Sequence, residues 1–200
     1  MSTDPYLIVG LGNPGPQYAR TRHNVGWLVV EKLADAYGLG FDRLQFKARV
    51  AQGTPHGQRV ILAKPLTYMN LSGEAVGPLL RFYKVSLDHL LLVYDEMDIP
   101  FGTLRIRPNG GSGGHGGMKS VIATLRSDNF PRIRVGVGRP PPGWDPPDFL
   151  LAPWTRDEET DVPTLVERAA QAANIWLTEG LLTAMNRFNV GAGAAGRGNG

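Results

Sequence analysis

Short apolar runs alternate with segments of helical periodicity along this chain, and that alternation limits its fold more than any other feature. The runs typical of strands are residues 6–9, 46–52, 59–63, 90–94, 104–107 and 133–137. The segments typical of helices are residues 25–37, 72–84, 118–126, 161–178 and 181–188. Strands that alternate with helices pack as a sheet covered on both faces. The pattern therefore predicts an α/β fold, a three-layer α/β/α sandwich around a twisted sheet.

The sheet is expected to be mixed, because two of its strands follow one another through a short turn. The runs 46–52 and 59–63 are separated by a segment that contains proline and glycine, which is typical of a hairpin and of antiparallel pairing. The chain has no internal repeat and no linker, so residues 1–190 are expected to form a single domain. Residues 191–200 contain only Gly, Ala, Arg and Asn, and we expect them to be a mobile tail.

Prolines set two further expectations in the C-terminal part of the chain. Residues 139–147 hold five prolines and are expected to form an extended loop. Pro163 suits the second position of a helix, because that position needs no backbone N–H donor. Asp161 would then be the N-cap of a helix that ends near Thr178.

Composition excludes several classes of protein. The chain has 200 residues, 42% of them hydrophobic, and 20% are charged, which is typical of a globular protein. It has no cysteine, so disulfides, thiol catalysis, iron–sulfur clusters and cysteine zinc sites are excluded. It has no run of 18 apolar residues and no signal peptide at its start, so we expect a cytoplasmic protein without a membrane span.

Basic residues gather in one part of the chain. The segment 105–139 contains seven basic residues and one acidic residue, a net charge of +6, whereas the whole chain has a net charge of +3. Charge alone fits a solvated face of scattered arginines, but such a concentration is also typical of a protein with a polyanionic partner.

A glycine pattern follows the first strand and resembles a dinucleotide-binding fingerprint. Residues 10–15 are Gly-Leu-Gly-Asn-Pro-Gly, but prolines follow, and the helical pattern begins only near Val25. The acid that such a fingerprint needs about 20 residues further on is missing at a strand end. We therefore interpret the segment as a tight turn that presents Asn13, followed by a loop that carries Tyr18, at an edge of the sheet where ligands bind. A glycine-rich turn in which Asn13 only bonds its own backbone fits this segment equally well.

Of the four histidines, His23 is the strongest candidate for a general base. It lies at the start of a helix, where unpaired amides disfavour the imidazolium, so we expect a neutral ring near pH 7. His115 lies in the glycine-rich loop 109–117, which favours ligand contact over proton transfer. Asp95 follows the buried strand 90–94 and is our candidate for the carboxylate that orients His23.

A third loop supplies a polar group beside these. Residues 64–73 follow a strand and contain Asn70, whose amide can donate to a carbonyl oxygen. Two asparagines, one histidine and one aspartate from three strand ends are a plausible site for attack on a carbonyl. No nucleophile elbow and no metal-ligand spacing occur, so water is the expected nucleophile.

Several motifs in order closely resemble the bacterial peptidyl-tRNA hydrolases. They are residues 7–18 (LIVGLGNPGPQY), 21–26 (TRHNVG), 64–73 (KPLTYMNLSG), 94–102 (YDEMDIPFG), 110–119 (GGSGGHGGMK), 134–140 (RVGVGRP) and 148–151 (DFLL). The similarity spans about residues 6–190, so the single domain, residues 1–190, would be catalytic.

The resemblance implies a cytoplasmic, monomeric esterase without a metal or other cofactor and without an obligate protein partner. It would cleave the ester between peptide and tRNA, with His23 as general base and Asp95 as its orienting partner. The substrate-binding residues that it implies are Asn13, Tyr18, Met69, Asn70, His115 and Gly116. The basic segment would hold phosphates of the tRNA acceptor stem through Arg105, Arg107, Lys119, Arg132 and Arg134.

The sequence departs from the family at one position, because Gly116 stands where an asparagine is common after the loop histidine. Three alternatives follow for the amide contact to substrate or water: it is missing, it is moved to Ser112 or Asn109, or a backbone group replaces it. The alternative function is a non-catalytic RNA-binding protein of the same fold. A pure binding protein would not need His23, Asp95 and both asparagines, so the sequence favours the enzyme.

Overall fold

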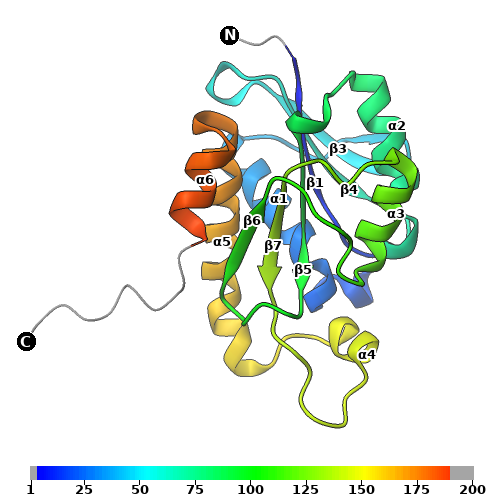
Figure 1. Cartoon of the computed structure of the whole chain (residues 1–200), viewed down its shortest axis with the longest axis vertical. Helices are drawn as coiled ribbons and strands as arrows, with labels where there is room; N and C mark the ends of the chain where they lie inside the picture. Colours follow the sequence, from blue (N-terminus) through cyan, green and yellow to red (C-terminus); the bar gives the residue numbers. More distant parts are fainter. Residues whose placement is uncertain (1–3, 190–200) are drawn as a thin grey trace, which may run out of the picture.

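A seven-stranded mixed sheet forms the centre of the computed structural model, which describes residues 4–189 (Figure 1). The strands are β1 (Tyr6–Gly10), β2 (Arg43–Gln45), β3 (Ala48–Gly53), β4 (Val60–Pro65), β5 (Leu90–Glu96), β6 (Leu104–Arg107) and β7 (Arg132–Gly136). Their order in the sheet is β2-β3-β4-β1-β5-β7-β6. β4, β1, β5 and β7 are parallel, whereas β2, β3 and β6 pair antiparallel. The predicted mixed sheet is confirmed.

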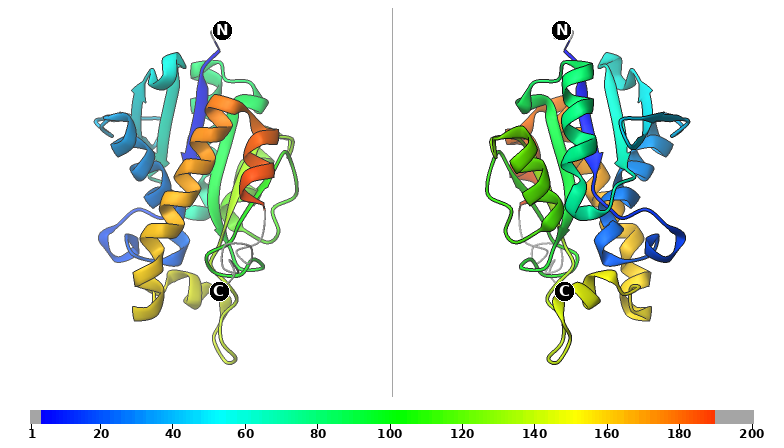
Figure 2. Two further views of the ribbon diagram at one scale, coloured as in Figure 1. Left: turned by 90° about the vertical axis from the view of Figure 1, so that its left-hand side faces the viewer. Right: turned by 90° about the vertical axis from the view of Figure 1, so that its right-hand side faces the viewer.

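Helices cover both faces of this sheet (Figure 2). They are α1 (Val25–Tyr37), α2 (Gly73–Tyr83), α3 (Gly116–Leu125), α4 (Pro146–Leu151), α5 (Arg156–Glu179) and α6 (Leu181–Phe188). α1, α5 and α6 lie on one face, and α2 and α3 lie on the other (Figures 1 and 2). The three-layer α/β/α sandwich is confirmed. No helix among residues 4–189 is both long and apolar enough to cross a bilayer.

Strand β5 shows why the centre of the sheet is so apolar. Leu91 and Val93 belong to the core beneath α1 and α5, whereas Leu90, Leu92 and Tyr94 belong to the core beneath α2 and α3. Successive side chains of a strand point to opposite faces, so a strand covered on both sides must be apolar throughout.

The parallel strands bring four loops to one edge of the sheet. β1, β4, β5 and β7 run in the same direction, so their carboxyl ends lie together. The chain leaves β1 toward α1 on one face and leaves β4 toward α2 on the other. A point where connections diverge in this way leaves a crevice at the carboxyl edge, where ligands bind in open α/β sheets.

Two glycines allow the chain after β1 to lie directly on the sheet. A Cβ atom on Gly26 would lie 2.3 Å from the carbonyl oxygen of Val93, and a Cβ atom on Gly10 would lie 2.0 Å from the carbonyl oxygen of Gly26. Both distances are far inside van der Waals contact, so only glycine fits at either position. The glycine-rich segment therefore serves the close approach of α1 to β1 and β5.

The structure corrects four element boundaries. Phe46 and Lys47 form a turn with positive φ, so the expected strand 46–52 begins at Ala48, and β2 precedes it. α3 begins at Gly116 and ends before Arg126, which takes the left-handed conformation. Helix α4 begins at Pro146, inside the expected loop 139–147, because proline suits the first turn of a helix.

The fourth correction concerns α5, which begins at Arg156 and not after Asp161. Its N-cap is Thr155, whose hydroxyl accepts from the Glu158 amide while the Glu158 carboxylate accepts from the Thr155 amide. This reciprocal capping box outcompetes a start at Asp161, so Pro163 lies inside the helix. The expected tail, residues 191–200, lies outside the described residues.

Candidate active site

A cavity of about 980 Å³ opens at the carboxyl edge of the parallel strands. All eight residues expected for catalysis and substrate binding line it: Asn13, Tyr18, His23, Met69, Asn70, Asp95, His115 and Gly116. They come from the loops after β1 and β4, from the end of β5, and from the start of α3. The fold therefore brings together residues that the sequence separates by as many as 103 positions.

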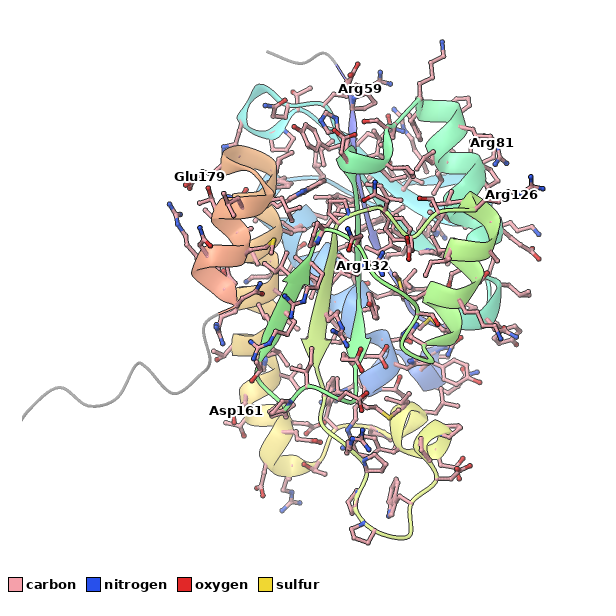
Figure 3. The ribbon with its side chains drawn as sticks, in the orientation of Figure 1. Arg59, Arg81, Arg126, Arg132, Asp161 and Glu179 are labelled. Carbon is pink, nitrogen blue, oxygen red and sulfur yellow. The ribbon has the colours of Figure 1, made fainter. Side chains whose placement is uncertain are left out.

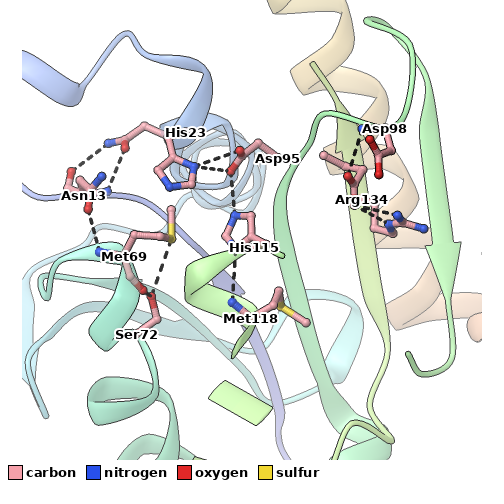
Figure 4. Close-up of polar contacts among 11 residues, drawn as sticks. Asn13, His23, Met69, Ser72, Asp95, Asp98, His115, Met118 and Arg134 are labelled. Carbon is pink, nitrogen blue, oxygen red and sulfur yellow. Dashed lines mark hydrogen bonds and ion pairs between the residues drawn. The ribbon is translucent and has the colours of Figure 1, made fainter. Parts of the chain in front are cut away.

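His23 and Asp95 form a hydrogen-bonded pair at the base of this cavity (Figure 4). His23 lies in a one-turn 3-10 helix, Arg22–Asn24, that leads into α1, and Asp95 is the penultimate residue of β5. Both carboxylate oxygens of Asp95 lie 2.9 Å from His23 Nδ1. The Asp95 side chain is 1% exposed and that of His23 is 13% exposed. The pair leaves His23 Nε2 as the ring nitrogen with no hydrogen-bond partner among residues 4–189.

The pKa of His23 is shifted in the direction opposite to the one expected from its position at the start of a helix. Burial lowers the pKa of His23, but the charge of Asp95 and its hydrogen bond raise the pKa by more, so it lies above its usual value. Burial disfavours the charged form of Asp95 too and so raises its pKa, but the two neighbouring histidines lower that pKa by more, to well below its usual value. Asp95 is therefore ionised at neutral pH, and it stabilises the proton that His23 would gain as a base.

Both ring nitrogens of His115 have partners, although the sequence placed this residue in a glycine-rich loop. It is the N-cap of α3, its side chain is 6% exposed, and its Nε2 lies 3.0 Å from Asp95 Oδ1. Its Nδ1 accepts from the Met118 amide at 3.2 Å. A nitrogen that accepts carries no proton, so the network assigns the proton to Nε2, which donates to Asp95. His115 thus steadies the carboxylate, and both of its nitrogens are engaged.

Asn13 is oriented by two neighbours. Its Oδ1 accepts from the Met69 amide at 2.7 Å, and this contact turns its Nδ2 into the remaining donor. Its backbone N–H donates to Asn24 Oδ1 at 2.8 Å, and Asn24 Nδ2 donates to the Asn13 carbonyl at 2.9 Å. Asn24 is fully buried. The sequence analysis missed Asn24, although it directly follows His23, because its role depends on a partner eleven residues away.

The far wall of the cavity carries Asn70 and Gly116. Asn70 is exposed in the one-turn 3-10 helix Met69–Leu71, and Met69 packs beneath it, 5% exposed. A Cβ atom on Gly116 would lie 3.9 Å from the Asn70 Cβ, which is ordinary contact. A Cβ atom would therefore fit at position 116. Tyr18 also lines the cavity; it is half-buried in the one-turn 3-10 helix Pro16–Tyr18 after β1.

Two further parts of the cavity were not foreseen. Glu96 lines it next to Asp95, 7% exposed, with its carboxylate on Arg134. α4 supplies an apolar wall through Pro146, Pro147, Leu150 and Leu151. The motif at 148–151 pointed to this part of the chain, but the sequence analysis assigned residues 139–147 to a loop and so did not predict α4.

The structure separates the five expected phosphate-binding residues. Arg132 is 1% exposed, and its guanidinium donates to the carbonyls of Gly110, Asp128 and Phe130. Figure 3 labels Arg132 near the centre of the view. Because this side chain is buried and its donors are engaged, the expectation of a phosphate contact is wrong for Arg132. Its N–H donors bond to backbone carbonyls because the side chain of this β7 residue is buried inside the protein.

The other four basic residues differ in how free they are. Arg134 donates twice to Glu96 Oε2, at 3.0 and 2.7 Å, and Arg105 donates to the Asn189 carbonyl at 2.9 Å. Arg107 and Lys119 are exposed and have no carboxylate partner within the described part of the chain. These two remain the best phosphate-binding candidates of the group.

His23, Asp95 and His115 are also the residues that could hold a metal ion. Their ligand atoms all lie within 4.8 Å of one another. The sequence showed no metal-ligand spacing, because the three ligands come from three separate elements. In the structure both histidine rings bond to the Asp95 carboxylate.

A His–Asp pair and an asparagine donor line one cavity at the carboxyl edge of an α/β sheet, an arrangement that could promote hydrolysis. The peptidyl-tRNA hydrolase family model matches residues 7–195. A peptidyl-tRNA hydrolase of Chloroflexus aurantiacus is 51% identical over 92% of this chain and 98% of its own length. One of Symbiobacterium thermophilum is 46% identical over the same shares. The crystal structure of the Acinetobacter baumannii peptidyl-tRNA hydrolase, 34% identical, has a TM-score of 0.88 over 95% of this chain and 97% of that chain. The chain belongs to the peptidyl-tRNA hydrolase family.

Proposed function

We propose that this protein hydrolyses the ester bond between the peptide and the tRNA of peptidyl-tRNA, with His23 as the general base. The observation that carries the proposal is the His23–Asp95 pair, whose carboxylate holds Nδ1 at 2.9 Å and leaves Nε2 free in the cavity. Asp95 fixes the tautomer in which Nε2 has a lone pair for a proton. Family membership supports the choice of ester.

In the proposed reaction His23 Nε2 takes a proton from a water molecule as the water oxygen attacks the ester carbonyl carbon. The carbonyl oxygen becomes an oxyanion, and the Asn13 Nδ2 donor stabilises it, with Asn70 holding the neighbouring peptide group. The bond from this carbon to the ribose oxygen then breaks. His23 returns its proton to the ribose oxygen, so free tRNA and a peptide acid leave.

The tRNA acceptor stem would lie toward β6 and α3. Leu104 of β6 is paired with Val135, which is paired with Asp95, so Arg107 lies three residues further along β6. Two strand spacings and three residue rises put Arg107 roughly 14 Å from Asp95. That separation suits a phosphate of the stem when the terminal nucleotide is in the cavity. We propose that the enzyme acts as a cytoplasmic monomer.

The test is hydrolysis of an N-acetylated aminoacyl-tRNA by the wild type and by His23→Ala, both with EDTA present. We expect release of free tRNA by the wild type alone, because only it has the base, and EDTA has no effect. Binding of tRNA without cleavage by either protein would support the alternative, a non-catalytic RNA-binding protein. Loss of wild-type activity in EDTA would instead assign a metal to the cluster of His23, Asp95 and His115.

A further inference from the structure

The residue before the catalytic histidine is a buried arginine that the reaction does not use. Arg22 is 2% exposed, and it belongs to the same one-turn 3-10 helix as His23. A buried guanidinium needs several acceptors, because each unpaired donor costs free energy. Its partners therefore show what this residue does.

The Arg22 guanidinium collects the carbonyls at the end of α4. Its Nη1 donates to the carbonyls of Phe149 and Pro153, both at 3.1 Å, with the Ala152 carbonyl at 3.4 Å. The last carbonyls of a helix have no partner within the helix, and a positive charge there is favourable. Arg22 thus caps the C-terminal end of α4 from another part of the chain.

The same guanidinium also contacts the start of α5. Its Nη2 lies 2.5 Å from Glu158 Oε2, the oxygen that accepts from the Thr155 amide in the capping box. The guanidinium carbon lies 4.1 Å from the centre of the Phe149 ring and 5.5 Å from that of Trp154. The planar guanidinium therefore hydrogen-bonds to the end of α4, forms an ion pair with α5 and stacks near two aromatic rings. A lysine ammonium could not make all of these contacts at once.

α4 is the apolar wall of the active-site cavity, and it packs directly on the turn that carries His23. Thr21, at the start of that turn, forms a β-bridge with Pro153. The 3-10 turn Arg22–Asn24 therefore connects α4, through the Arg22 hydrogen bonds, to Asp95, through the His23 hydrogen bond. We propose that Arg22 is a positioning residue that fixes α4 relative to His23 and so sets the width of the substrate cavity.

The kinetic part of this proposal rests on the proposed function, whereas the structural part does not. In Arg22→Lys we expect amide hydrogen exchange to accelerate in residues 148–152, which are the residues of this segment that carry a backbone N–H, and little elsewhere. With peptidyl-tRNA we expect KM to rise about tenfold or more, the effect of losing one charge-assisted hydrogen bond. The pH midpoint of kcat/KM should not move, because His23 and Asp95 keep their contacts.

Two further variants control the experiment. Arg20→Gln breaks an exposed ion pair with Glu159 that joins the same two segments without contacting α4, and we expect it to match the wild type. Glu158→Gln keeps a capping-box residue at its position but removes the charge beside Arg22. We expect a KM between those of the wild type and Arg22→Lys.

Three results would overturn the proposal. Exchange in residues 148–152 that matches that of Arg20→Gln would show that Arg22 does not hold α4. Acceleration spread evenly over the chain would make Arg22 a contributor to global stability only. Faster exchange at α4 with unchanged KM would separate α4 from substrate binding. If the wild type does not hydrolyse peptidyl-tRNA, the proposed function fails, and the exchange comparison still decides whether Arg22 holds α4.

Discussion

Replacing Asp95 by asparagine tests the central pair with almost no change in shape. Asp95 Oδ1 faces both His23 and His115, whereas Oδ2 faces His23 alone. In Asp95→Asn the oxygen is expected to stay with the His115 N–H, which leaves the amide nitrogen facing His23 Nδ1. That nitrogen donates, so His23 would carry its proton on Nε2 and would lose the lone pair that a base requires.

The expected loss follows from the charge and the geometry. Two unit charges about 4 Å apart interact by about 4 kcal/mol at an effective dielectric constant of 20. Removing that attraction from a transition state with a protonated His23 lowers the rate by about 10³. The wrong tautomer adds to this, and loss of the carboxylate in a Ser-His-Asp triad costs about 10⁴. We therefore expect kcat to fall by about 10³ to 10⁴.

The pH dependence gives a second, independent readout. A base must be neutral, so kcat/KM rises with pH as His23 loses its proton, with a midpoint above about 6.5 in the wild type. In Asp95→Asn burial still lowers the pKa of His23, while the attraction that raised it is gone. The midpoint should therefore fall below about 6.5.

The assay is hydrolysis of an N-acetylated aminoacyl-tRNA from pH 5 to 9, with thermal unfolding measured at each pH. The stability check is needed because the pKa of His23 is raised in the fold. Its protonated form therefore stabilises the protein below about pH 6.5, and this stability is lost as the pH rises through the raised pKa. Asp98→Asn is the control, since Asp98 is an exposed carboxylate paired with Arg139. A folded Asp95→Asn protein with turnover within tenfold of the wild type, or with an unmoved midpoint, would refute the reasoning.

Three more predictions follow from the geometry. Arg107→Ala should raise KM and reduce the slope of log KM against log salt by about one, because one phosphate contact is lost; an unchanged slope would argue against the contact. Asn24→Ala should lower kcat, because the Asn13 backbone loses two hydrogen bonds, and should cost about 1–3 kcal/mol in urea unfolding; normal turnover would contradict this. Gly26→Ala should destabilise the fold by about 1–3 kcal/mol through overpacking and so lower Tm, since its Cβ would lie 2.3 Å from a carbonyl oxygen. Gly116→Ala should leave Tm unchanged, because its Cβ would lie at an ordinary contact distance of 3.9 Å from the nearest atom. Equal Tm values for the two alanine variants would show that close approach is not what Gly26 provides.

The sequence alone was sufficient for the layered architecture and for the central residues of the candidate site. Apolar periodicity is a local property, so it locates β1, β5, α1 and α2 to within a few residues. The parallel strands then determine that the loops after them meet at one edge, which is why Asn13, Asn70 and Asp95 could be grouped before the fold was known. The start of α5 was a local signal that the sequence analysis missed, because Thr155 and Glu158 have the capping-box spacing but the helix was expected to begin after Asp161.

Tertiary structure decided which polar groups are free to act. His115 and Arg132 both look like exposed loop or surface residues in the sequence, yet one is bonded to Asp95 and the other to backbone carbonyls. Arg22 bonds to carbonyls 127 to 131 residues away. Periodicity and residue type report how a segment folds and what a side chain could bind. They do not report which distant group hydrogen-bonds to that side chain, because this depends on how the packed elements place backbone carbonyls and carboxylates around the side chain.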